Sequence, residues 1–273
     1  MNFTWTDDGT RLEKISTHGT TPYNWLFLPG GPGIGSEYFH ALTPSLKLPG
    51  TTWHLDLPGS GSNARHASEV YDFKTWTTCL LNTLKAFENV ILVGHCFGAM
   101  LPLSCLEMEK QPLKGFVIMN ASPEEWRSAC GEMGKLHQLP PLKPHLKYFL
   151  ENPSDAAFKE LMQQAVPYLF TDRMHAAGLV LFNSTPLTHQ PYHWGQVQFF
   201  NDYQTRWVPT VPTMILGGQK DYTTPLSLFR EDGRFNKHPM LIKEIAGGSH
   251  FPWLENMPAV IKAFYEFSLL TCQ

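Results

Sequence analysis

The sequence predicts an α/β fold in which a mostly parallel sheet is flanked by helices, and three observations support this prediction. Six short apolar runs are separated by stretches of helical character, which is the pattern of parallel strands joined by crossover helices. Several of these runs end directly in Gly, Pro or Asn. Between about residues 121 and 207 no strand-like run occurs, and the spacing of apolar residues there indicates helices.

The first expected element is a hairpin over residues 5–12, in which Asp8-Gly9 is a turn signal. Strands of the main sheet are then expected at residues 25–28, 52–55, 90–93, 116–119, 213–216 and 241–245. Apolar spacing predicts helices within 158–170 and 172–182, and the proline-rich stretch 140–144 is expected to be a turn or linker. Because ligands bind beyond the carboxyl ends of strands in an open α/β sheet, functional residues should follow these runs directly.

The strand at 90–93 runs into Gly94-His95-Cys96-Phe97-Gly98 and then into a helical stretch. A strand that ends in Gly-x-nucleophile-x-Gly before a helix is typical of a nucleophile elbow, here with Cys96 as the nucleophile. The glycines let strand and helix approach closely, and the positive end of the helix favours a thiolate. The alternative is that Cys96 is a small buried hydrophobic residue, as cysteine often is.

Glycine-rich loops follow the first two main-sheet strands, at residues 29–33 and 56–62. A loop beside an elbow can direct a backbone N–H at a developing oxyanion, together with the N–H that follows the nucleophile. Gly31 and Phe97 are therefore the expected oxyanion-hole residues. Each loop alone has the composition of an ordinary turn, but two such loops before an elbow favour a catalytic site.

A general base and its orienting acid should follow the nucleophile in the order acid, then histidine. Asp221 comes after the strand at 213–216, and His250 comes after the strand at 241–245. We expect His250 to take the proton of Cys96 or to pair with its thiolate, and Asp221 to fix the imidazole tautomer. Glu124, just after the strand at 116–119, is the alternative acid. The alternative for each residue taken alone is an ordinary surface position, with Asp221 as a solvated loop carboxylate and His250 as a surface histidine.

Together the motifs resemble the α/β-hydrolase superfamily, and in particular its proline iminopeptidase branch. That branch carries H-G-G-P-G, D-x-x-G-x-G-x-S, G-x-S-x-G, a G-x-x-D turn and a terminal G-x-x-H. Matching stretches run from about residue 25 to 121 and from about 212 to 258, roughly half the chain. Pro29 stands where the family has histidine, and Cys96 stands where it has serine. A cysteine nucleophile on this fold is similar to that of dienelactone hydrolases, polyhydroxyalkanoate synthases and some thioesterases.

The resemblance also implies a helical cap inserted into the α/β-hydrolase core. We expect a first part of the core at residues 1–122, the cap at 123–207 and a second part of the core at 208–273. In the iminopeptidase branch, cap acids bind the free amine of the substrate, and the acids available here are Glu124, Glu125, Glu132, Glu151 and Glu160. Cap aromatics suggest an apolar acyl or ring pocket, although such residues are more often simply core; they are Tyr168, Phe170, Phe182, Tyr192, Trp194, Phe199 and Phe200.

Composition excludes several other classes. The 273 residues carry a formal net charge of −3 and 16% charged residues, so no basic field for nucleic acid or a membrane surface is expected. The start of the chain lacks the features of a signal peptide, and no apolar run is long enough to span a bilayer, which predicts a cytoplasmic protein. Five cysteines without C-x-x-C spacing argue against a disulfide framework.

No cofactor and no metal are expected. The chain has neither a dinucleotide-binding glycine motif with its acid nor a P-loop, and its twelve histidines show no H-E-x-x-H spacing. The sequence therefore predicts a cofactor-free hydrolase that acts through an acyl-enzyme on an ester, a thioester or an N-terminal prolyl-type amide. Two other classes stay open: an acyltransferase or thioesterase acting on acyl thioesters, and a non-catalytic protein that binds a small ligand on a hydrolase scaffold. The partner is expected to be a small acyl or short peptide substrate, and the sequence does not indicate an oligomeric state.

Overall fold

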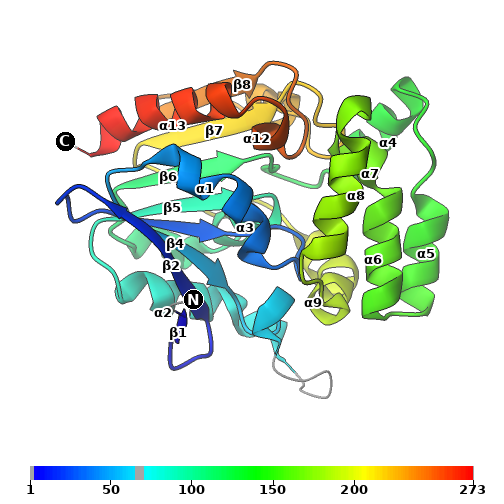
Figure 1. Ribbon diagram of the computed structural model, residues 1–273, viewed down its shortest axis with the longest axis horizontal. Helices are drawn as coiled ribbons and strands as arrows, with labels where there is room; N and C mark the ends of the chain where they lie inside the picture. Colours follow the sequence, from blue (N-terminus) through cyan, green and yellow to red (C-terminus); the bar gives the residue numbers. More distant parts are fainter. Residues whose placement is uncertain (1–2, 65–70, 273) are drawn as a thin grey trace.

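The computed structural model describes residues 3–64 and 71–272, and its centre is one sheet in the order β1-β2-β4-β3-β5-β6-β7-β8 (Figure 1). β1 and β2 are antiparallel to their neighbours, and β4, β3, β5, β6, β7 and β8 run parallel. The strands are β1 (Phe3–Trp5), β2 (Arg11–His18), β3 (Asn24–Leu28), β4 (Gly50–Asp56), β5 (Val90–His95), β6 (Gly115–Met119), β7 (Thr213–Gly218) and β8 (Met240–Ile245). The hairpin and all six expected main-sheet strands are present, which confirms the predicted fold class.

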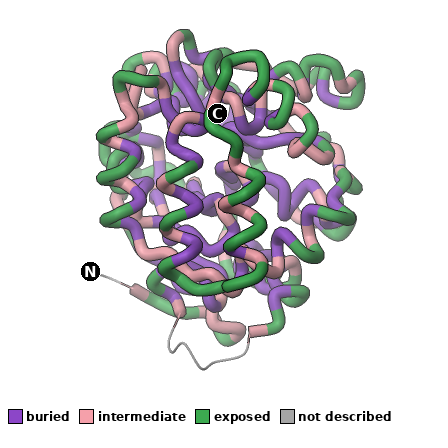
Figure 2. The backbone as a smooth tube through the Cα atoms, turned by 90° about the vertical axis from the view of Figure 1, so that its right-hand side faces the viewer, coloured by how far each residue is buried: buried purple, intermediate pink, exposed green. Residues whose placement is uncertain are grey.

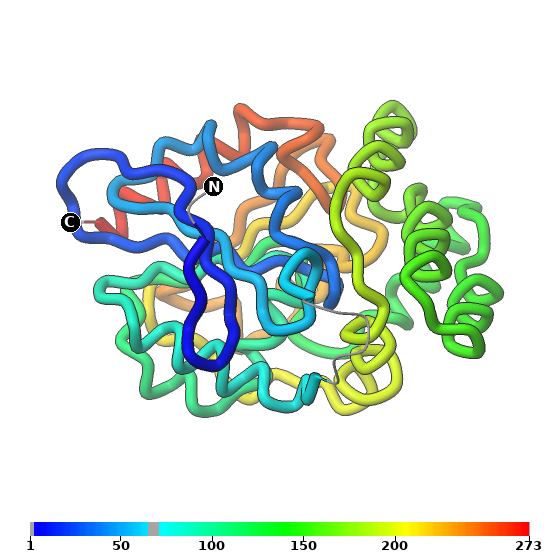
Figure 3. Tube along the Cα trace, turned by 60° about the horizontal axis from the view of Figure 1, so that its bottom comes forward, coloured from blue at the N-terminus to red at the C-terminus, as the bar shows by residue number. Residues whose placement is uncertain are grey.

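The central strands are buried on both faces because helices cover the sheet on either side (Figure 3). Along β3, Trp25 and Phe27 contribute to one hydrophobic core, and Leu26 and Leu28 contribute to the other. This alternation follows from the two-residue period of a strand. The first core includes residues of α1 (Thr43–Leu46), α12 (Pro252–Glu255) and α13 (Met257–Thr271); the second includes residues of α2 (Trp76–Lys85), α3 (Phe97–Leu103) and α11 (Ser227–Glu231).

Helices occupy the chain between β6 and β7, and we call this part the helical segment. In Figure 1 it stands beside the sheet, and Figure 2 shows that its outer surface is largely exposed. Pro144, expected in a turn or linker, instead lies in the first turn of α5, where a missing N–H costs no helical hydrogen bond. Its helices are α4 (Arg127–Leu136), α5 (Lys143–Glu151), α6 (Asp155–Gln164), α7 (Val166–Leu169), α8 (His175–Ser184), α9 (His189–Trp194) and α10 (Phe200–Asp202).

Shorter helical turns complete the connections. Within the described residues, five are 3₁₀ turns, and η6 is a π-turn that continues α9. They are η1 (Ser36–Ala41), η2 (Gly61–Asn63), η3 (Phe73–Thr75), η4 (Leu106–Lys110), η5 (Asp172–Met174) and η6 (Gly195–Phe199).

A buried ion pair joins the antiparallel edge of the sheet to the loop after β3. Asp56, at the end of β4, lies 2.6 Å from the guanidinium of Arg11 on β2. The same carboxylate accepts hydrogen bonds from the backbone N–H of Ser36 at 2.8 Å and from its hydroxyl at 2.6 Å. Burial raises the pKa of Asp56 to about 6, although Arg11 opposes this shift. The pair fixes the start of η1, and with it the loop that approaches Cys96.

We predict that Asp56→Ala lowers the free energy of unfolding by about 3–5 kcal/mol, because it leaves a buried guanidinium without its nearest counter-ion. Denaturant unfolding of the purified variant measures the change. Glu244→Ala, which removes an exposed ion pair with Arg230, is the control and should cost less than about 1 kcal/mol. Equal losses in the two variants would show that Asp56 does not anchor the loop.

Candidate active site

Cys96 stands at the turn between β5 and α3, as the elbow motif predicts. Its backbone has φ 53° and ψ −121°, a conformation that residues with a side chain seldom adopt and that tends to be held at functional sites. A methyl group at Gly94 would collide with the carbonyl oxygen of Gly98, and one at Gly98 would collide with that of Leu28. Both elbow glycines are therefore required by close packing of backbone against backbone.

Asp221 and His250 lie together although they are far apart in the sequence. Asp221 Oδ2 and His250 Nδ1 are 2.9 Å apart, and both side chains are almost fully buried. The other carboxylate oxygen, Oδ1, accepts hydrogen bonds from the backbone N–H groups of Thr223 at 2.9 Å and Thr224 at 3.0 Å. Asp221, and not the exposed Glu124, is thus the acid that contacts the imidazole.

The pKa values of His250 and Asp221 depend on each other's charge. Burial lowers the pKa of His250, but the negative charges of Asp221 and Cys96, and hydrogen bonds with both, outweigh burial and raise it to about 10. Burial raises the pKa of Asp221, but the charge of His250 and the surrounding donors bring it below its usual value. The arrangement favours an imidazolium beside the Asp221 carboxylate.

The two expected oxyanion-hole residues come from separate segments, the loop after β3 and the start of α3. Gly31 is in the loop after β3 and, like Cys96, lines the cavity described next. Phe97 is the first residue of α3, where a backbone N–H has no partner within the helix. The Phe97 side chain packs in the second core, against Trp76 and Phe199. Phe97 is not among the described residues that line the cavity, so its role in an oxyanion hole stays a prediction about its backbone N–H.

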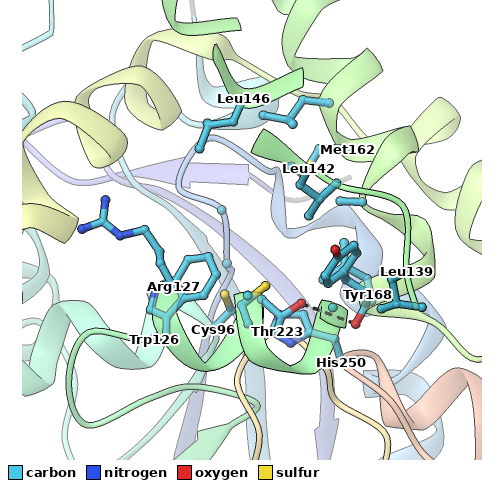
Figure 4. Close-up of a pocket in the computed structure, with 18 of the residues that line it drawn as sticks. Cys96, Trp126, Arg127, Leu139, Leu142, Leu146, Met162, Tyr168, Thr223 and His250 are labelled. Atoms are coloured by element: carbon cyan, nitrogen blue, oxygen red, sulfur yellow. Dashed lines mark hydrogen bonds between the residues drawn. The ribbon is translucent and has the colours of Figure 1, made fainter. Parts of the chain in front are cut away.

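A cavity of about 740 Å³ opens above Cys96 and His250, between the sheet and the helical segment (Figure 4). Its wall is mainly apolar and is contributed largely by the helical segment, including residues of α4, α5, α6 and α7. Of the described residues that line it, none is Asp or Glu, so the five cap acids considered from the sequence lie outside its wall. Residues that surround the cavity include Leu139, Leu142, Leu146, Leu161, Met162 and Phe182.

Comparison with protein families matches residues 25–263 to the description "Alpha/beta hydrolase family". The chain belongs to the alpha/beta hydrolase family. This membership confirms the predicted enzyme class. The matched residues include both parts of the sequence in which the motifs lie. No curated protein matches the α/β-hydrolase sequence closely enough to serve as a relative.

Several solved structures are similar in fold to this α/β-hydrolase. A proline iminopeptidase-related protein from Thermus thermophilus has a TM-score of 0.73 and 20% identity, with 99% of this chain and 98% of that chain covered. A thermophilic esterase from Thermogutta terrifontis has a TM-score of 0.71 and 16% identity, with 99% of this chain and 97% of that chain covered. A meta-cleavage product hydrolase from Pseudomonas fluorescens has a TM-score of 0.68 and 16% identity, with 94% of this chain and 93% of that chain covered. At these identities the likeness shows the fold alone.

The part of this α/β-hydrolase that the structure describes contains no helix with both the length and the apolar character of a membrane span.

A hydrogen-bonded chain that the sequence analysis missed runs beneath the site of the α/β-hydrolase. The backbone N–H of Gly30 donates to the hydroxyl of Tyr38 at 2.7 Å, and this hydroxyl lies 2.9 Å from His95 Nδ1. His95 Nε2 lies 2.9 Å from the carbonyl oxygen of His250. The simplest assignment of protons has Tyr38 donating to Nδ1 and Nε2–H donating to the carbonyl. His95, inside the elbow motif, therefore links the glycine-rich loop to the loop of His250.

Two further residues hold the loops of the site. Asn120, which follows β6, donates to Asp221 Oδ2 and to the carbonyl of Ser249, each at 2.9 Å. Thr188, from the helical segment, donates its hydroxyl to the carbonyl of Gly59 at 2.8 Å and its N–H to that of Gly33 at 2.9 Å. Asn120 could have been found from its place at the end of an expected strand. Thr188 carries no such signal.

We predict that the imidazole of His250 stays doubly protonated from about pH 7 to about pH 9, because its pKa is raised to about 10. Nitrogen NMR of the histidine rings measures this directly. His95 is an internal reference, since burial lowers its pKa to about 3 and keeps it neutral over the same range.

In Asp221→Asn, the main charge that raises the pKa of His250 is absent, so deprotonation should move to lower pH by at least about one unit. Loss of the His250 proton near pH 6.5 in the unmodified protein would contradict the proposed charge arrangement.

Proposed function

We propose that this α/β-hydrolase cleaves carboxylic esters or thioesters with an apolar acyl group through a Cys96–His250–Asp221 triad. The observation that carries the proposal is the buried Asp221–His250 pair beside a nucleophile-elbow cysteine, at the floor of an apolar cavity. The arrangement has the three parts of an activated nucleophile: the attacking group, a base and a residue that orients the base.

In the proposed first half-reaction, the Cys96 thiolate attacks the acyl carbon and forms a carbon–sulfur bond. The backbone N–H groups of Gly31 and Phe97 stabilise the negative charge on the carbonyl oxygen. When the tetrahedral intermediate collapses, the bond to the leaving alkoxide or thiolate breaks, and His250 gives that group the proton on Nε2.

In the second half-reaction, the now neutral His250 takes a proton from water, and the resulting hydroxide attacks the acyl carbon of the thioester. The carbon–sulfur bond breaks, the acid leaves, and the thiolate–imidazolium pair is restored. Throughout, Asp221 accepts the Nδ1 proton in a hydrogen bond and keeps Nε2 directed at the reacting atoms.

The cavity wall favours an uncharged or anionic substrate over a cationic amine. The charged side chains on the wall are basic: Arg127, Lys135 and Lys143. A substrate with a free N-terminal amine would find no carboxylate among the described wall residues. Esters and thioesters therefore fit the site better than N-terminal prolyl amides, and we propose that the helical segment acts as a cap that excludes water from them.

We predict that Cys96→Ala lowers turnover of p-nitrophenyl esters or acyl thioesters by at least about a thousandfold, because no other group can form the acyl-enzyme. Cys130→Ala is the matched control, since Cys130 also lines the cavity and burial raises the pKa of its thiol to about 12. This control should keep most of the activity.

The same assay separates the other classes. Full activity in Cys96→Ala would contradict the triad. Faster product formation with an added alcohol or thiol acceptor would indicate an acyltransferase, and turnover of a prolyl arylamide alone would indicate a peptidase. Tight binding of a substrate analogue without turnover, and without an acyl group on Cys96, would indicate a binding protein.

We also predict that Met162→Trp shortens the range of accepted acyl chains, because Met162 on α6 is buried in the cavity wall and an indole would occupy acyl space. We expect kcat/KM for an octanoyl ester to fall at least about tenfold relative to an acetyl ester. Leu136→Trp, at an exposed position of α4 outside the cavity wall, should leave this ratio unchanged. An unchanged ratio in Met162→Trp would place the acyl group elsewhere.

A further inference from the structure

Three side chains of the kind that bind transition metals meet at the antiparallel edge of the sheet, outside the wall of the catalytic cavity. Glu13 on β2 and His54 on β4 are direct cross-strand partners, so their side chains lie on the same face. His40 is on η1, which packs against this part of the sheet. The three come from separate elements, which is why no spacing along the sequence indicates them.

The three ligand atoms are already close together. Glu13 Oε2 lies 2.9 Å from His40 Nε2 and 3.8 Å from His54 Nδ1, and all three atoms lie within 4.8 Å of one another. Around a tetrahedral Zn²⁺ with bonds of about 2.0–2.2 Å, neighbouring ligand atoms are about 3.3 Å apart. The two distances to Glu13 bracket this value, and the His40 side chain is 44% exposed whereas that of His54 is fully buried.

One ring nitrogen of His54, Nδ1, has no hydrogen-bond partner in the described part of the chain. Its ring is fully buried, and no described hydrogen-bonding group lies within reach of Nδ1. The other nitrogen, Nε2, lies 2.9 Å from the hydroxyl of Thr43, which itself donates to the carbonyl of Phe39. With the Thr43 hydroxyl donating to Phe39, Thr43 accepts the Nε2 proton, and this tautomer has a lone pair on Nδ1 facing Glu13.

His54 Nδ1 and Glu13 Oε2 face each other at 3.8 Å, which is beyond hydrogen-bond distance. A buried lone pair that faces a carboxylate oxygen without a hydrogen between them is costly, and a cation would satisfy both. The hydroxyl on the far side of the ring is the kind of outer partner that fixes the tautomer of a metal-bound histidine.

The charge around the three residues also suits a cation. Arg11 is nearby, but its guanidinium is bound to Asp56 at 2.6 Å and to Glu37 at 2.9 Å. The positive charge of Arg11 is thus opposed by two carboxylates. Glu13 pairs with His40 at 2.9 Å, and an ion bound between them would take the place of that contact.

We propose that Glu13, His40 and His54 form a structural site for Zn²⁺ or a divalent ion of similar chemistry, with solvent in the remaining position beside His40. Two imidazole nitrogens and one carboxylate oxygen are a ligand set that binds Zn²⁺ with water in the fourth position. The ion would join β2 and β4 to η1. Because η1 also carries Tyr38, metal binding would stabilise the segment that contacts the glycine-rich loop of the active site.

The test is titration of the chelator-treated full chain with Zn²⁺ in a calorimeter, in a Cys96→Ala background so that the catalytic thiol does not bind the ion. We expect one equivalent to bind, and His40→Ala to weaken this binding at least about tenfold. His189→Ala is the matched control, because His189 is also partly exposed and lies 2.6 Å from a single carboxylate, that of Asp155. It should bind Zn²⁺ as the parent does.

Thermal unfolding and Co²⁺ give independent readouts. Zn²⁺ should raise the unfolding midpoint of the parent by several degrees and leave that of His40→Ala unchanged. Co²⁺ should give the visible absorption of a four-coordinate nitrogen–oxygen site, and this absorption should be lost in Glu13→Gln. Equal Zn²⁺ affinity in parent, His40→Ala and Glu13→Gln, or no binding at millimolar Zn²⁺, would overturn the proposal.

Discussion

The site depends on the buried carboxylate of Asp221. Its two oxygens lie against donors from several parts of the chain: its own turn, Asn120 after β6, and His250 after β8. A buried carboxylate is costly unless its lone pairs are satisfied, and here the donors that satisfy it also set where the loops lie. The same hydrogen bonds therefore keep Asp221 ionised and hold His250 in one orientation.

Next to this charged pair lies a second imidazole that must stay neutral. The rings of His95 and His250 are 4.9 Å apart, and their surroundings shift their pKa values in opposite directions. Burial lowers the pKa of His95, whereas the charge of Asp221 outweighs burial and raises that of His250. His250 faces a carboxylate and a thiol, whereas His95 lies between a phenol hydroxyl and a carbonyl oxygen. Two like charges at this distance in a buried setting would be strongly unfavourable, so a neutral His95 allows His250 to be charged.

Contacts that depend only on the order of strands and residues along the chain could be predicted from the sequence. Asp221 and His250 each follow an apolar run, and parallel strands bring their carboxyl ends to one edge of the sheet, so the contact between these residues could be anticipated. Tyr38 and the trio of Glu13, His40 and His54 could not. Their contacts depend on the register of β2 against β4 and on the position of η1, which are set by packing. The cavity wall also required the structure, because helical periodicity does not tell whether any of the cap glutamates faces inward.

The cysteines of this chain differ sharply in environment. Burial raises the pKa of the thiols of Cys79, Cys105, Cys130 and Cys272, so all four are poor nucleophiles at neutral pH. Among the five cysteines, all of which lie in the described part of the chain, Cys96 alone faces an imidazolium. With Cys96 as the proposed nucleophile, a mild electrophile would react there first, and the native chain would offer one preferred attachment point for a fluorophore, a spin label or a covalent inhibitor. Cys272, the other partly exposed cysteine, is the position to check for a second label.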